Sequence, residues 1–137
     1  ELLGPNSMYV VRIDGYFNRV AARTELYQHE PYKPFAKVLE TDERRFAFEN
    51  IEGSLVCFHF PPFMDGVNTP GWHFHFINAA RTLGGHVFDV DMVRGTATLN
   101  KTDRFILDLP SNQAFQYADL ANASKEDIHK VEQGGGD

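Results

Sequence analysis

The sequence feature that most constrains the fold of this chain is a short run in which histidine and phenylalanine alternate. Residues 70–76 read Pro-Gly-Trp-His-Phe-His-Phe. Successive side chains of a β-strand point to opposite faces, so His73 and His75 share one face while Phe74 and Phe76 share the other. The alternation therefore predicts a strand with one face available for a core and one face that carries two imidazoles.

A second predicted strand, over residues 85–91, carries a third histidine. The residues between the two strands lose the alternation and can reverse the chain, and a Gly-Gly pair opens the second strand. If the strands pair antiparallel with Phe76 opposite Gly85, then His75 lies opposite His86. Directly opposed residues share a face and have Cβ atoms about 5 Å apart. We therefore expect the three imidazoles to converge on one point.

Three imidazoles with no thiolate nearby form a ligand set that suits a divalent metal such as zinc. Histidine is the commonest metal ligand, and three protein ligands leave a coordination position open for water or substrate, as in catalytic zinc sites. The alternative interpretation is that these are strand histidines that face solvent. The His-x-His spacing followed by Gly-Gly-His favours a zinc site formed by His73, His75 and His86.

The composition is that of an ordinary globular protein. The chain has 137 residues, of which 42% are hydrophobic and 23% charged, and this length suits one domain with its own core. The formal charge of −6 gives no electrostatic reason to expect nucleic acid or an anionic membrane as a partner. Cys57, the single cysteine, lies in an apolar run, so we expect a buried structural thiol and no intrachain disulfide.

The sequence also bears on location in the cell. No segment approaches the ~20 apolar residues of a membrane span and no signal peptide is visible, so we expect a cytoplasmic protein without a membrane partner. The chain begins at Glu1 without an initiator methionine, so we expect a fragment or a processed product.

The remaining patterns predict an α+β fold with a mostly antiparallel or mixed sheet built from hairpins. Asp14-Gly15 lies between two hydrophobic runs and predicts a two-residue hairpin turn. A second turn is expected around Gly53. Strands are expected over residues 8–13, 16–23, 46–49, 54–60, 70–76, 85–91, 96–100 and 104–109, which makes seven or eight in all.

Two or three short helices complete the predicted fold. Pro34 suits the first turn of a helix, and that helix is expected to end in the charged run 41–45, a solvated loop or helix end. Residues 111–120 are expected to hold a short helical turn. Ser124 is a candidate N-cap for a last helix that runs to Gln133.

The two histidine segments, residues 70–76 and 84–87, resemble the zinc motif of the α-acetolactate decarboxylase family. The resemblance spans nearly the whole chain and matches the family's second half, so residues 1–137 are expected to form a single domain similar to its C-terminal, zinc-binding half. The other segments that carry the resemblance are residues 9–15, 20–24, 31–32, 48–50, 53, 55, 109–110, 115, 119–120 and 129–132.

This resemblance implies that His73, His75 and His86 bind Zn²⁺ and that Arg23 and Glu132 are active-site residues. Without it, Arg23 would be a surface arginine at a strand end and Glu132 a solvated glutamate at a helix end. The implied reaction converts 2-hydroxy-2-methyl-3-oxobutanoate (2-acetolactate) to acetoin and CO₂, with zinc as a Lewis acid at the ketone oxygen. Arg23 would hold a carboxylate or the developing oxyanion, and Glu132 would protonate the enediolate carbon or orient a water that does.

One departure from the family concerns the rest of the enzyme. Family members carry a preceding N-terminal half that supplies a further catalytic glutamate, and nothing in this chain corresponds to it. We therefore expect the chain alone to be a weak decarboxylase at best. We also expect it to form a homo-oligomer or to pair with a missing N-terminal half, and to act on a small 2-hydroxy-3-oxo acid.

Two other functions stay open. One is a stand-alone, non-catalytic metal-binding domain similar to the plant and prokaryote conserved domain, whose short members carry a similar histidine pattern and are associated with DNA-binding proteins. The other is a metal-binding half-domain left after loss of a partner segment. Arg23 and Glu132 favour the decarboxylase, whereas chain length favours the alternatives. His29 and His59 are expected at the surface, and His129 is left unassigned.

Overall fold

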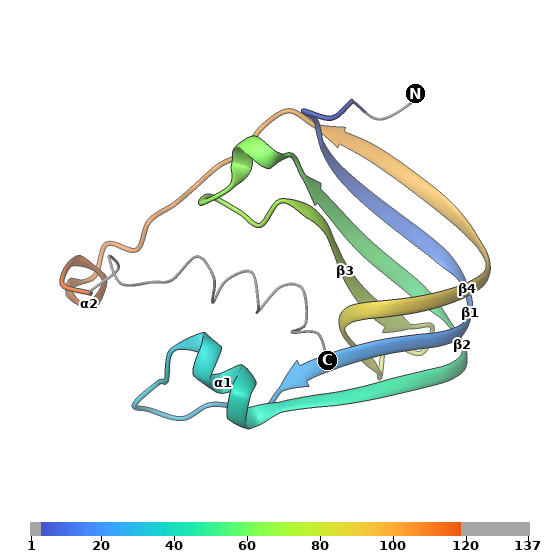
Figure 1. Cartoon of the computed structure of the whole chain (residues 1–137), viewed down its shortest axis with the longest axis horizontal. Helices are drawn as coiled ribbons and strands as arrows, with labels where there is room; N and C mark the ends of the chain where they lie inside the picture. The colour runs from blue at the N-terminus through green and yellow to red at the C-terminus, as the bar shows by residue number, and fades with distance from the viewer. Residues whose placement is uncertain (1–3, 119–137) are drawn as a thin grey trace.

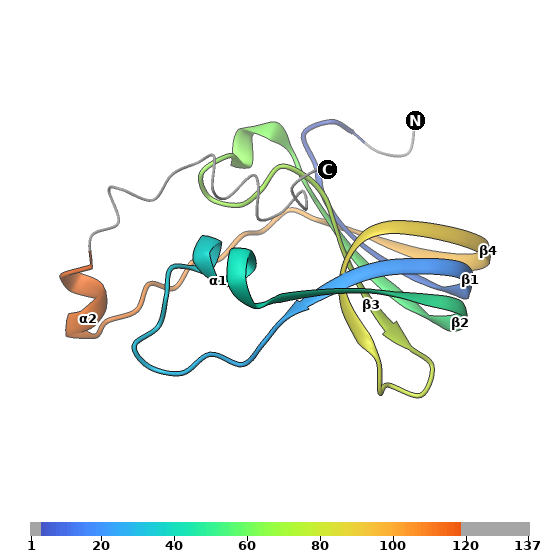
Figure 2. The same ribbon diagram turned by 60° about the horizontal axis from the view of Figure 1, so that its bottom comes forward.

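A computed structural model describes residues 4–118 of the chain, and this part is built around long antiparallel strands (Figure 1). Both views show the helices at one end of the molecule and the bends of the strands at the other (Figure 2). The elements in chain order are β1 (Met8–Glu25), α1 (Phe35–Asp42), β2 (Glu43–Phe60), the 3₁₀ turn η1 (Pro62–Met64), β3 (Gly71–Asn78), β4 (Gly84–Thr102) and α2 (Gln113–Gln116).

The strands form one sheet that closes on itself. β1 pairs antiparallel with β2 along one edge and with β4 along the other. β3 pairs antiparallel with the second part of β2 and with the first residues of β4, which completes the order β1-β2-β3-β4. The expectation of a mostly antiparallel sheet with few helices is therefore confirmed.

A row of glycines crosses the three long strands near their middles. Gly15 lies opposite Gly53 on one side and opposite Gly95 on the other. A Cβ atom on Gly15 would collide with the carbonyl oxygen of Arg94, and one on Gly53 would lie 2.6 Å from the ring of Phe76. Glycine inside a strand often marks a tight bend, so we attribute the sharp curvature of β1, β2 and β4 in Figure 1 to this row.

The turns predicted at Gly15 and Gly53 are wrong. Asp14-Gly15 is not a hairpin turn and Gly53 does not separate two strands, because both segments continue through as β1 and β2. The residues on either side of Asp14-Gly15 do not pair with each other, since β2 and β4 already occupy both edges of β1. Residues 104–109 are not a strand either, so the described part of the chain has four strands, three of them long, where seven or eight short ones were expected.

The helical predictions fare better. α1 begins directly after Pro34, buries Val38 and ends where β2 begins, inside the charged run that was expected to end it. α2 lies within the segment expected to hold a helical turn. The helix predicted from Ser124 lies outside the described residues. No helix among residues 4–118 is long and apolar enough to cross a membrane.

The core lies on one face of the sheet. The residues of β1 that face the core are odd-numbered in the first part of the strand and even-numbered in the second. Val11 and Phe17 are buried on the core side, and beyond Phe17 that side is occupied by Val20 and Ala22. The odd-to-even change coincides with an irregularity at Phe17, where the pairing with β4 shifts register and then returns to it. Cys57 is buried as expected, and burial raises the pKa of its thiol to about 11. The core cluster comprises Val11, Phe17, Val20, Ala22, Leu55, Cys57, Phe76 and Val87.

Candidate metal centre

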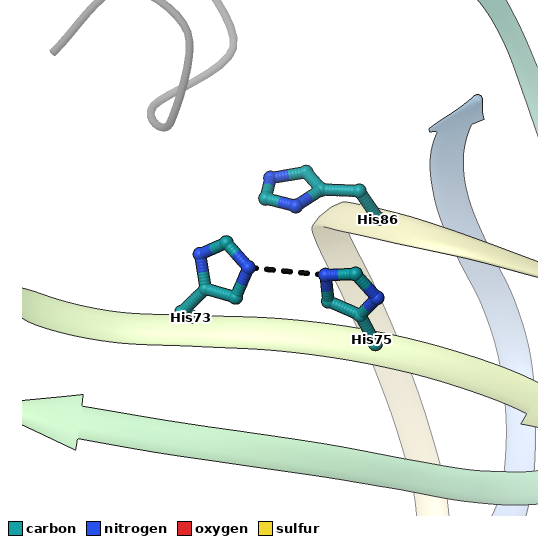
Figure 3. A group of neighbouring side chains, drawn as sticks. All are labelled: His73, His75 and His86. Atoms are coloured by element: carbon teal, nitrogen blue, oxygen red, sulfur yellow. Dashed lines mark hydrogen bonds between the residues drawn. The ribbon is translucent and has the colours of Figure 1, made fainter. Parts of the chain in front are cut away.

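The three histidines lie together, as the sequence predicts (Figure 3). His73 and His75 project from the same side of β3, and His86 reaches them from β4. β3 and β4 pair in the predicted register, with His75 opposite His86. One ring nitrogen from each histidine lies within 4.8 Å of the others, and the Nε2 atoms of His73 and His75 are 3.0 Å apart.

The residues between the histidines explain why the imidazoles occupy this face. Phe76 is 3% exposed and belongs to the core, and Phe74 packs against the core cluster. The Gly-Gly pair lets β4 approach its neighbours closely. A Cβ atom on Gly84 would lie 2.5 Å from the carbonyl oxygen of Phe76, and one on Gly85 would lie 2.7 Å from the carbonyl oxygen of Arg23. Alternation and glycines together fix the position of His86 opposite β3.

A pocket of about 530 Å³ opens beside the histidines. β2 supplies apolar side chains to it because Val56 lies directly opposite His75 and Phe58 directly opposite His73. An apolar wall with a few converging polar groups is typical of sites for small molecules. The lining residues are Val56, Phe58, Phe60, Asn68, His73 and His75.

Arg23 lies on the same face, one strand away from His86. It is directly opposite His86 in the pairing of β1 with β4, and directly opposite Arg45 in the pairing of β1 with β2. Arg45, Arg23, His86 and His75 therefore form a row across the sheet whose side chains share a face. Arg23 is only 3% exposed, so the interpretation of Arg23 as a surface arginine at a strand end is wrong.

The buried guanidinium of Arg23 is paired with a carboxylate that sequence reasoning missed. Nη1 of Arg23 donates to Oε2 of Glu43 at 2.8 Å, and Nε of Arg45 donates to Oε1 of Glu43 at 2.5 Å. Burial alone would raise the pKa of Glu43, but the hydrogen bonds from Arg45 and Arg23 outweigh it and lower that pKa below its ordinary value. Glu43 is therefore an ionised carboxylate held between two cations.

The sequence did contain a signal for Glu43. It lies in the charged run 41–45, which was expected to be a solvated loop or helix end, but β2 begins at Glu43. Once the strand is known to begin there, the spacing of two between Glu43 and Arg45 places both on one face. The start of the strand depends on its pairing with β1, which the local pattern does not reveal.

Of the remaining candidate residues, the structure describes His29 and His59. His29 is exposed in the loop before α1 and its ring contacts Tyr27. His59 is half-buried rather than at the surface, and its ring lies against those of Trp72 and Tyr9. Glu132 and His129 lie outside the described residues.

The three-histidine cluster fits a divalent metal by its donor set. Zinc binds imidazole nitrogen at about 2.0–2.1 Å, so donor nitrogens around one ion lie about 3–4 Å from one another. The spacing of 3.0 Å between His73 and His75 is in this range, and the limit of 4.8 Å for the whole cluster is close to it. Neutral imidazoles with no thiolate among them suit zinc and similar ions.

Comparison with known proteins shows the family of the chain. The model of the family described as "Alpha-acetolactate decarboxylase" matches residues 1–122. The alpha-acetolactate decarboxylase of Methanosarcina mazei is 41% identical over 132 residues, which cover 96% of this chain and 46% of the relative. That of Bacillus subtilis is 37% identical over 128 residues, which cover 93% of this chain and 50% of the relative. The chain thus spans about half the length of these curated relatives.

Solved structures agree as well. The crystal structure of alpha-acetolactate decarboxylase from Bacillus subtilis strain 168 matches with a TM-score of 0.86 at 36% identity, over 96% of this chain and 56% of that one. A Staphylococcus aureus protein of unknown function, similar to alpha-acetolactate decarboxylase, matches with a TM-score of 0.85 at 25% identity, over 99% of this chain and 57% of that one. The chain belongs to the α-acetolactate decarboxylase family.

Proposed function

We propose that this chain carries the zinc-binding part of an active site that decarboxylates 2-acetolactate to acetoin and CO₂. Membership of the family supports the reaction. The observation that carries the proposal is the convergence of His73, His75 and His86 beside a pocket of about 530 Å³. We further propose that residues 1–137 are one domain equivalent to the zinc-binding half of the longer relatives.

In this proposal the three histidines, Arg23 and Glu132 each have a separate chemical role. Zinc, when bound by the three histidines, supplies Lewis-acid polarisation of the substrate's ketone oxygen. The imidazoles must be neutral to bind a metal, so binding releases any protons that they carry. Arg23 offers a planar, permanently charged fork to the substrate carboxylate or to the developing oxyanion. The carbon that loses CO₂ must take up a proton, and we propose Glu132 as the source of that proton or as the residue that orients the water that supplies it.

The apolar side of the pocket also contributes. Val56, Phe58 and Phe60 line it, and they would pack against the methyl groups of the small 2-hydroxy-3-oxo acid. Removal of water from this wall strengthens the electrostatic contacts on the opposite side of the substrate.

The direct test is formation of acetoin and CO₂ from 2-acetolactate by the purified, zinc-loaded chain. We expect a rate well below the ~10 s⁻¹ that is typical of enzymes for the chain alone, and a higher rate when it is co-expressed with the remaining portion of a full-length relative. His75→Ala should abolish product formation in both cases. His29→Ala is the matched control, because it removes an exposed histidine outside the cluster.

The possible outcomes separate the parts of the proposal. An ordinary enzymatic rate from the chain alone would contradict the expectation that it needs a second half. No acetoin under either condition, from protein that holds zinc at the cluster, would contradict the decarboxylase and favour a non-catalytic metal-binding domain.

A further inference from the structure

We propose that Glu43, where α1 passes into β2, is a positioning residue that holds the guanidinium of Arg23 on the histidine face. This inference rests on the proposed function, because it assigns a task to the arginine that would contact the substrate. It adds a residue to which neither the sequence pattern nor the resemblance gave a role.

The geometry of the sheet places Glu43 beside Arg23. Glu43 and Arg45 are two apart on β2 and so share a face. Arg45 is directly opposite Arg23, and Arg23 is directly opposite His86. Beyond Phe17 the core side of β1 is occupied by the even-numbered Val20 and Ala22, which leaves the odd-numbered Arg23 on the other face.

The side chains of Arg23 and Glu43 are both nearly buried. The side chain of Arg23 is 4% exposed and that of Glu43 is 11% exposed. A guanidinium stays protonated in proteins, so a buried one needs an anionic partner. Glu43 is such a partner, at 2.8 Å. The long arginine side chain has many rotamers, and this contact selects among them.

Glu43 lies between two positively charged side chains. Arg45 is 47% exposed, binds the second oxygen of Glu43, and lies over the ring of Phe88 with its guanidinium carbon 5.4 Å from the ring centroid. The carboxylate of Glu43 is thus shared between two guanidiniums, of which that of Arg23 is the buried one. A planar, permanently charged guanidinium suits the carboxylate of a 2-hydroxy-3-oxo acid.

The same contacts argue that Glu43 is not itself a proton donor. The hydrogen bonds from Arg45 and Arg23 hold its pKa below the ordinary value despite burial, so at neutral pH it has no proton to give. Its role is to orient Arg23, and it acts on the substrate only through Arg23.

The test compares Glu43→Gln with wild type in the form of the enzyme that makes acetoin. Gln keeps the shape of the side chain but removes its charge. We expect kcat/KM to fall about 10- to 100-fold, since a misplacement of about 1 Å can cost this much, while zinc content stays unchanged. The matched control is Glu49→Gln, which makes the same change at an exposed position of β2.

A double-mutant cycle shows whether Glu43 acts through Arg23. In an Arg23→Lys background, Glu43→Gln should lower kcat/KM by less than two-fold, because the group that it orients is already altered. Full additivity of the two changes would overturn the proposal. If Glu43→Gln fails to fold, Glu43→Asp, which keeps the charge but shortens the side chain, replaces it, and an unchanged kcat/KM would also overturn the proposal.

An NMR measurement tests whether Glu43 holds Arg23, whether or not the enzyme makes acetoin. The guanidinium N–H signals of Arg23 should exchange slowly with water in the wild-type protein and at least ten-fold faster in Glu43→Gln. If wild type makes no acetoin, the proposed function fails, yet these signals still show whether Glu43 holds Arg23. Unchanged exchange in Glu43→Gln would overturn the positioning role whether or not the enzyme is active.

Discussion

Arg23 and Glu43 show how the candidate site depends on single side chains. Both are nearly buried, Arg23 lies in the row that ends at the histidines, and Glu43 lies two residues before Arg45 of that row. A buried ion pair adds little net stability when both partners are present, but removal of one partner leaves an uncompensated charge. The pair therefore makes a specific prediction about stability as a function of pH.

The pKa of Glu43 is lowered in the folded protein from an ordinary value near 4.5. Its ionised form thus contributes stability above that value, and the contribution is lost as pH falls through the lower folded pKa. We expect Glu43→Gln to lower the free energy of unfolding by about 1–3 kcal/mol at pH 7. This difference from wild type should shrink as the pH falls below about 4.

Urea unfolding of both proteins at a series of pH values measures this difference. Glu49→Gln, at a position whose side chain is 61% exposed, should differ little from wild type at every pH. A gap between Glu43→Gln and wild type that widens in acid would contradict the assigned ionic state of Glu43.

Among the elements, the hairpin of β3 and β4 was predictable and the long strands were not. His73 to Phe76 carries a local alternation and the Gly-Gly pair marks where β4 begins, and the register assumed from them, with Phe76 opposite Gly85, is the one observed. The path of β1 through Asp14-Gly15 depends on β2 and β4, which are distant in sequence. The change near Phe17 that leaves Arg23 on the histidine face is not visible in the local sequence pattern either.

The glycine row makes a prediction of its own. A Cβ atom on Gly53 would lie 2.6 Å from the ring of Phe76, whose other neighbours form the core. We expect Gly53→Ala to lower the free energy of unfolding by about 1–3 kcal/mol or more, because the side chain forces strands or core residues apart. Denaturant unfolding checks the value.

The control for this change is Gly4→Ala. Gly4 is exposed, and a Cβ atom there would make only an ordinary contact with Ser7 at 3.6 Å. Its effect should stay within about 0.5 kcal/mol. Equal effects at Gly4 and Gly53 would contradict the tight packing of Gly53 against Phe76.

In the whole molecule, the closed sheet brings together residues from all four described strands. The first part of β2 supplies Glu43 and Arg45, and its second part supplies the apolar wall opposite β3. This closure could not be predicted from the sequence, since it depends on which strand edges meet, whereas the histidine cluster needed only one local hairpin. The relatives are about twice as long as this chain.

The most direct measurement of the central claim is the metal content of the purified chain after removal of metal by a chelator and reconstitution with zinc. Elemental analysis should find about one zinc ion per chain in wild type and in His29→Ala, and most of it lost in His75→Ala, because two imidazoles hold a divalent ion far more weakly than three. Undiminished zinc in His75→Ala would contradict a site formed by His73, His75 and His86.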